Sequence, residues 1–90
     1  VKSVRVLISG RVQGVWYRAW TEEQAVSRGL SGWVRNLTDG TVEAVFSGGE
    51  ETVADMIAAC RQGPPLARVK DVVQEDADEP ESGFATLPTQ

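Results

Sequence analysis

Apolar and polar residues alternate with a short period in several segments of this 90-residue chain. These segments are rich in β-branched and aliphatic residues, as are strands that bury one face or both. The segments that predict strands are residues 3–9, 31–38, 41–47 and 67–74, with a possible short fifth strand at 83–87. Between the second and the third, the pair Asp39-Gly40 is typical of a two-residue hairpin turn.

Two other segments follow the period of an α-helix. In residues 50–62, four apolar residues recur at the spacing of one helix face, which is expected to be buried. They are Val53, Met56, Ile57 and Cys60. Residues 19–28 contain strong helix formers, and Gly29 directly after them is typical of a helix end.

The predicted order is strand-helix-strand-strand-helix-strand, which is a split βαβ arrangement. Right-handed crossovers place both helices on one face of an antiparallel sheet. The expected fold class is therefore α+β, a ferredoxin-like α/β sandwich that forms a single domain over residues 1–90. Many unrelated activities share this fold, so function has to be inferred from individual residues.

The distribution of charge along the chain excludes some classes of binding partner. The net charge of −4 arises from the acidic segment 75–81 (EDADEPE), which is expected to be a solvated loop; outside it, nine basic residues face eight acidic ones. Without a basic stripe, no binding to nucleic acid is expected. No apolar stretch approaches the roughly 20 residues of a membrane-spanning helix, and no signal peptide is apparent, so no membrane association is expected.

The absence of histidine is the most restrictive feature of the composition. It excludes Ser-His and Cys-His nucleophile pairs, histidine general bases and histidine-ligated metals. Cys60 is the single cysteine and lies on an apolar helix face, so we expect a core residue, no disulfide and no cysteine-based metal site. A chain without disulfides fits a cytoplasmic location.

The segment 10–18 (GRVQGVWYR) joins the first strand to the first helix and contains the first candidate site. Gly10 and Gly14 allow backbone conformations in which successive amides converge on an anion, beside the positive end of the helix dipole. Arg18 would lie in the first helical turn, where a cation opposes the dipole unless an anion is bound. From the residues alone, a tight turn followed by a solvated arginine is the more common alternative.

Asn36 is the second candidate, because asparagine is disfavoured inside strands. Alternation places it on the face of Val34, toward the helices, with Trp33 and Arg35 on the other face. A side-chain amide donates and accepts hydrogen bonds at once, so it can orient a water molecule. The residues alone leave open that Asn36 instead bonds the neighbouring turn. Glu43 is expected to pair with Arg35 across the strands or to be solvated.

Two long motifs resemble the signatures of the acylphosphatase family. Residues 10–18 match G-x-V-Q-G-V-x-[FY]-R, and residues 32–48 (GWVRNLTDGTVEAVFSG) match G-W-V-[basic or Gln]-N-x-x-x-G-x-V ending in glycine. The resemblance covers essentially the whole chain. It departs from the family at Trp16, where a smaller residue is frequent, and at Arg28, where leucine is common.

The resemblance implies roles for individual residues. Arg18 would bind the phosphate, and Asn36 would position the attacking water. The loop would surround the phosphate oxygens with its amides; the residues concerned are Gln13, Gly14, Val15, Trp16 and Tyr17. The family implies hydrolysis of a small-molecule acyl phosphate to a carboxylate and inorganic phosphate, by a cytoplasmic monomer that uses no metal and no other cofactor.

Two other functions stay open. The same fold and motif occur as a domain of larger proteins that mature metal centres, so the chain can be a non-catalytic module that binds phosphate or carbamoyl phosphate. RNA-recognition modules share the order of elements but carry aromatic and basic residues on the open sheet face. Trp33 and Arg35 are expected on that face, but the basic groove is missing, and the enzymatic interpretation is favoured.

Overall fold

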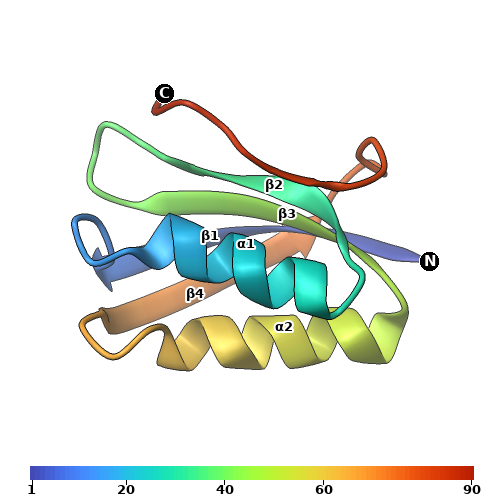
Figure 1. The fold of residues 1–90 in the computed structure, drawn as a ribbon, viewed down its shortest axis with the longest axis horizontal. Helices are drawn as coiled ribbons and strands as arrows, with labels where there is room; N and C mark the ends of the chain where they lie inside the picture. The colour runs from blue at the N-terminus through green and yellow to red at the C-terminus, as the bar shows by residue number, and fades with distance from the viewer.

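The computed structural model describes all 90 residues, which form one five-stranded sheet with two helices packed against it (Figure 1). The elements are β1 (Lys2–Arg11), α1 (Tyr17–Ser27), β2 (Ser31–Asn36), β3 (Val42–Gly48), α2 (Glu50–Gln62), β4 (Arg68–Asp76) and β5 (Phe84–Thr86). The strand order is β4-β1-β3-β2-β5. The predicted ferredoxin-like arrangement of four antiparallel strands and two helices is confirmed.

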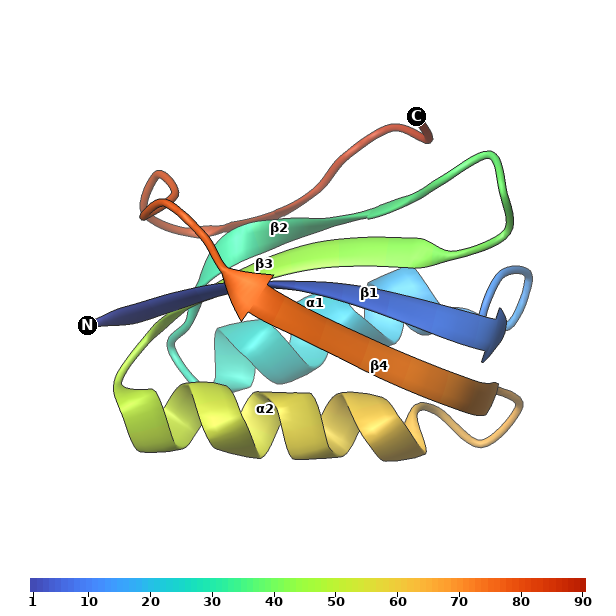
Figure 2. The ribbon, with the colours of Figure 1, turned by 180° about the vertical axis from the view of Figure 1, so that it is seen from behind.

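Both helices cover the same face of the sheet, and the opposite face is left open (Figures 1 and 2). The core lies between the two layers and contains 17 buried residues. Alternate residues of β1 and the predicted apolar face of α2 enter it; they are Val4, Val6, Ile8, Val53, Met56, Ile57 and Cys60. Neither helix has the length and hydropathy that crossing a membrane requires.

Gly32 allows β2 and β3 to approach one another closely. Its φ is 137°, and a Cβ atom there would lie 1.8 Å from the backbone oxygen of Val45 on β3. A side chain would therefore push the two strands apart. The first glycine of the G-W-V motif is thus required by the packing of the sheet, four residues before Asn36.

The prediction of a two-residue turn between β2 and β3 is wrong. Leu37 donates its amide hydrogen to the carbonyl of Thr41, which leaves a three-residue loop between them. The carboxylate of Asp39 accepts hydrogen bonds from the amide and the hydroxyl of Thr41, and Gly40 takes a φ of 95°. This side-chain bond favours the longer turn with a glycine in the left-handed region.

Two further expectations need correction at the C-terminal end. The acidic segment is not entirely a loop, because β4 continues to Asp76 and Glu75 pairs with Arg5 of β1 at 2.9 Å. The fifth strand exists but runs parallel to β2, so the sheet is mixed and not wholly antiparallel. Parallel pairing is possible there because the long connection after β4 returns the chain to the start of β2 (Figure 2).

A cluster of charges lies on the open face of the sheet. Glu43 of β3 is only 5% exposed and accepts hydrogen bonds from Arg35 (2.6 Å) and from Arg5, so the predicted cross-strand pair forms and gains a second arginine. The guanidinium of Arg35 also lies over the ring of Trp33, 4.8 Å from its centroid. Burial alone would raise the pKa of the Glu43 carboxyl, but the hydrogen bonds from both arginines outweigh it and lower that pKa below 4.5.

Substitution Glu43→Gln tests this cluster. The variant keeps the shape of the side chain but loses its charge, so the free energy of unfolding should fall by about 1–3 kcal/mol at neutral pH. Since the pKa of Glu43 is lowered by folding, its stabilisation is complete above pH 4.5 and is lost as the pH falls through the folded-state pKa. Urea denaturation from neutral pH down to about pH 2 measures the difference from wild type.

The control is Glu75→Gln, which removes a carboxylate that is 63% exposed and should change the unfolding free energy by less than about 1 kcal/mol. A gap between wild type and Glu43→Gln that is the same at both ends of the pH range would contradict this account.

Candidate active site

Three buried side chains anchor the loop between β1 and α1 in the core. Val12, Val15 and Tyr17 are all at most 4% exposed and belong to the core, and the Tyr17 hydroxyl donates to the backbone carbonyl of Cys60 at 2.7 Å. Between them, Gly14 and Trp16 adopt left-handed conformations, with φ of 73° and 66°. Alternation between left- and right-handed residues is the geometry that brings successive amides together around an anion.

The N-terminus of α1 carries unneutralised positive charge. No side chain caps it, its first turn contains no acidic residue, and no turn or loop hydrogen bond is donated by the amides of residues 13–19. In contrast, the first turn of α2 contains Glu50 and Glu51. The free amides and the dipole of α1 therefore favour an anion in this place.

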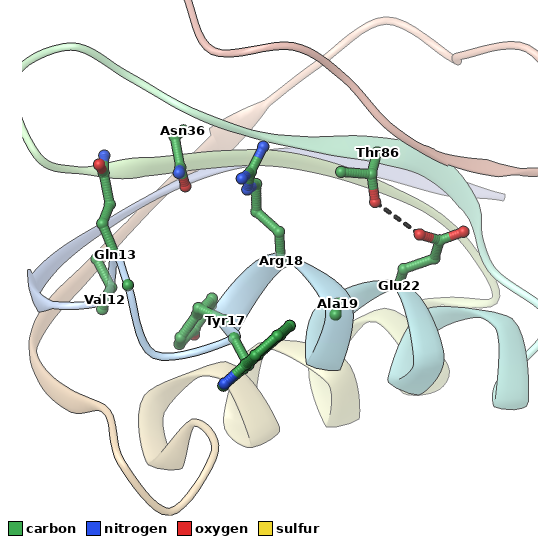
Figure 3. A pocket seen from close by; sticks show the side chains of 10 residues that line it. Val12, Gln13, Tyr17, Arg18, Ala19, Glu22, Asn36 and Thr86 are labelled. Atoms are coloured by element: carbon green, nitrogen blue, oxygen red, sulfur yellow. Dashed lines mark hydrogen bonds between the residues drawn. The ribbon is translucent and has the colours of Figure 1, made fainter.

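A pocket of about 540 Å³ lies over this helix end, between the loop, α1, the end of β2 and β5. Figure 3 shows Arg18 rising from α1 into the pocket between Asn36 on one side and Thr86 on the other. The residues that line the pocket are Val12, Gln13, Gly14, Trp16, Tyr17, Arg18, Ala19, Glu22, Asn36 and Thr86. The two principal candidates from the sequence are thus brought together.

Arg18 is the second residue of α1, in the predicted first turn, and is half-buried. Its guanidinium forms no ion pair or hydrogen bond with the protein, unlike those of Arg5, Arg28 and Arg35. A free guanidinium beside uncapped amides can bind an oxyanion with two parallel hydrogen bonds.

Asn36 is the last residue of β2 and lies on the same face as Val34, as predicted. Its Oδ1 atom is buried and has no hydrogen-bond partner in the protein, although buried polar atoms nearly always have one. The side chain of Asp39 satisfies the following turn, so the alternative that Asn36 does so is not observed. Because Asn36 lines the pocket, its side-chain amide is a candidate partner for a molecule bound there.

The structure shows a different use for the side chain of Gln13. Its Nε2 donates to the carbonyls of Leu37 and Thr41, at 2.8 and 2.9 Å, and so ties the loop to the turn that follows Asn36. The other loop residues differ in their orientation. Val15 does not line the pocket, the ring of Tyr17 is buried, and Trp16 is 77% exposed at the rim of the pocket. These residues can contribute to anion binding through their backbone amides.

Cys60 is fully buried, and its burial raises the pKa of the thiol to about 12. A thiol in this state is not a nucleophile at neutral pH, so the prediction of a core residue is confirmed. Among the side chains, no group of three or more His, Cys, Asp or Glu residues is arranged to hold a metal ion.

Two polar residues that line the pocket were not predicted from the sequence. Neither Glu22 nor Thr86 receives a role from the sequence, yet both line the pocket and share a hydrogen bond of 2.6 Å. The position of Glu22, four residues after Arg18, signals that both lie on one helix face. No sequence signal identifies Thr86, because its position depends on the parallel pairing of β5 with β2.

The family model described as Acylphosphatase matches residues 4–86 of the chain. The chain belongs to the acylphosphatase family. A curated relative named Acylphosphatase, from Rhodospirillum rubrum, is 54% identical over 90 residues, which cover 99% of each chain. The family resemblance seen in the two motifs is therefore confirmed over almost the whole sequence.

Solved structures agree with the assignment to the acylphosphatase family. The crystal structure of acylphosphatase from Bacillus subtilis matches with a TM-score of 0.91 and 31% identity, over 97% of this chain and 99% of that one. The chain is also similar to HypF from T. kodakarensis, with a TM-score of 0.86 and 27% identity, but it covers 12% of that larger protein.

The bridge made by Gln13 yields a prediction. Gln13→Met keeps the length of the side chain but removes both hydrogen bonds to the β2–β3 turn, so the free energy of unfolding should fall by about 1–3 kcal/mol. Chemical denaturation measures this change. Gln74→Met, at an exposed position of β4, is the matched control and should shift stability by less than about 0.5 kcal/mol. Equal effects of the two substitutions would show that the bridge contributes nothing.

Proposed function

We propose that this chain hydrolyses small-molecule acyl phosphates to a carboxylate and inorganic phosphate. The observation that carries the proposal is the meeting of two unsatisfied groups in one pocket. The guanidinium of Arg18 has no partner, and the buried Oδ1 of Asn36 has none either, at the uncapped N-terminus of α1. Membership of the acylphosphatase family supports the same activity.

The proposed roles follow from these groups. The phosphate would be bound by the guanidinium of Arg18 and by the loop amides from Gly14 to Tyr17, where the helix dipole adds positive charge. Oδ1 of Asn36 would accept a hydrogen bond from a water molecule and so direct a lone pair of that water toward phosphorus. Gln13 would act indirectly, by holding the loop and the end of β2 together.

An acyl phosphate suits a site of this kind. Its leaving group is a carboxylate, whose conjugate acid has a pKa of about 4–5, so it departs without a proton donor. Phosphoryl transfer requires mainly positioning and stabilisation of charge from the protein. Arginine, asparagine and backbone amides supply both, which explains how a chain without histidine can carry out the reaction.

The proposed reaction is a single displacement at phosphorus. The water oxygen forms a bond to phosphorus as the bond from phosphorus to the acyl oxygen breaks, and the acyl oxygen keeps the electron pair. The proton of the water passes to the released phosphate or to solvent. Charge on the equatorial oxygens is met by donors already in place, which is the efficient form of electrostatic catalysis.

We further propose that the protein acts as a cytoplasmic monomer without a nucleic-acid partner. The groups proposed to act, Arg18, Asn36 and the loop amides, would need no second chain to complete the site. Its one cysteine is buried and forms no disulfide, as is usual in a reducing compartment. On the open face of the sheet, Arg5 and Arg35 are paired with Glu43, so their charge is not available to a phosphate backbone.

A phosphate- or carbamoyl-phosphate-binding module of a larger protein is the second candidate, and the observation behind it is that the chain also resembles 12% of the larger protein HypF. Both functions would bind phosphate with the same loop amides and with Arg18. They differ in turnover, since a module that only binds has no need for an oriented water. The acyl-phosphate hydrolysis test below therefore separates them.

Purified protein should hydrolyse benzoyl phosphate in the presence of EDTA. Arg18→Ala and Asn36→Ala should each reduce kcat/KM by at least about 100-fold, because each removes a preorganised group from the transition state. Loss of the acyl phosphate is followed by its absorbance, and circular dichroism verifies the fold of each variant. Arg61→Ala, on the exposed side of α2, is the matched loss of an arginine and should retain full activity.

A folded wild-type protein that does not turn over the substrate would overturn the enzymatic proposal. Phosphate binding by such a protein, lost in Arg18→Ala, would then support the binding module.

A further inference from the structure

Glu22 introduces a negative charge into a pocket proposed to bind an anion. It lies four residues after Arg18 on α1, and both side chains line the pocket. Residues at this spacing are neighbours on the helix surface, and a carboxylate and a guanidinium attract one another there. An ion pair between Glu22 and Arg18 would occupy the donors that the phosphate needs.

The structure shows a different arrangement. An oxygen of the Glu22 carboxylate accepts a hydrogen bond of 2.6 Å from the hydroxyl of Thr86, and Arg18 has no partner. Figure 3 shows Glu22 turned toward Thr86, while Arg18 extends into the space between Thr86 and Asn36. The carboxylate is thus held at the end of the pocket farthest from Asn36.

The short strand β5 places Thr86 for this contact. It is the last residue of β5, and it pairs with Val34 of β2, two residues before Asn36. The amide of Leu87 continues the ladder by donating to the carbonyl of Val34 at 2.8 Å. The hydroxyl is therefore fixed to the same strand that carries Asn36.

We propose that Thr86 is a positioning residue that keeps the Glu22 carboxylate away from Arg18 and so leaves the guanidinium free for phosphate. This inference rests on the proposed role of Arg18 in binding phosphate. Without the hydroxyl, Glu22 would compete with the phosphate for the arginine. Exposed ion pairs of this kind change an equilibrium constant by roughly two- to fivefold, and the affinity for phosphate should fall by that factor.

A double-mutant cycle tests the proposal with the intact protein. Four proteins are compared: the wild type, Thr86→Val, Glu22→Gln and the double variant. Isothermal titration calorimetry measures the Kd of inorganic phosphate, and steady-state kinetics with benzoyl phosphate give KM and kcat. Thr86→Val should raise Kd and KM roughly two- to fivefold with little change in kcat, since Asn36 is not affected.

The decisive comparison is made in the Glu22→Gln background. There, Thr86→Val should no longer change Kd, because the competing charge has been removed. Thr86→Ser, which keeps the hydroxyl, should bind phosphate as tightly as the wild type. Since valine and threonine have the same shape, and both suit a strand, a general disturbance of β5 is not expected.

Two results would overturn the proposal. One is an equal loss of phosphate affinity on Thr86→Val with and without Glu22, which would assign the effect to β5 itself. The other is an unchanged Kd in every variant. Failure of the proposed function would appear differently, as absence of phosphate binding and of turnover in the wild type, and it would remove this inference as well.

Discussion

The structure depends on a concentration of positive charge at the N-terminus of α1 that no protein group neutralises. Uncapped amides, the helix dipole and the guanidinium of Arg18 all meet there, and their mutual repulsion opposes folding in the absence of an anion. The protein offsets this cost by packing. Val12, Val15 and Tyr17 anchor the loop in the core, and Gln13 fastens it to the β2–β3 turn.

The rest of the sheet serves to place Asn36 opposite this charge. Gly32 lets β2 approach β3 closely, and β5 pairs with the other edge of β2, so the strand that ends at Asn36 is held from both sides. On the open face of the sheet, the buried carboxylate of Glu43 is paired with Arg5 and Arg35. The buried side-chain atom without a partner, Oδ1 of Asn36, therefore lies in the same pocket as the unpaired Arg18, where an acyl phosphate and its attacking water would satisfy both.

Local patterns predicted most of the fold. The alternation in β1 and the apolar face of α2 are properties of neighbouring residues, and each appears in the structure as expected. The turn after β2 was missed because the side chain of Asp39 bonds Thr41 and lengthens the loop, a contact that outweighs the usual preference of an Asp-Gly pair. The direction of β5 was missed because it follows from a long connection and not from residues 83–87.

The candidate site likewise contains residues that local sequence could suggest and residues that it could not. Arg18 and Asn36 stood out as candidates because each is unfavourable for its local element, a cation at a helix N-terminus and an amide in a strand. The residues alone left ordinary alternatives open, and the proposed roles came from the family motifs. The bridging role of Gln13 and the contact between Glu22 and Thr86 could not be identified, because each joins segments that meet only in the folded chain. Residues that are locally unfavourable can be recognised in the sequence. The residues that position them through contacts between distant segments cannot.

The central claim is that water placed by Asn36 attacks phosphorus while the phosphate is held at the end of α1. Hydrolysis of benzoyl phosphate in water enriched in ¹⁸O tests it directly, with the label located in the products by mass spectrometry. Attack at phosphorus places one labelled oxygen in the inorganic phosphate and none in the benzoate. Label in the benzoate would show attack at the carbonyl carbon. It would contradict the roles assigned to Asn36 and to the phosphate-binding loop between β1 and α1.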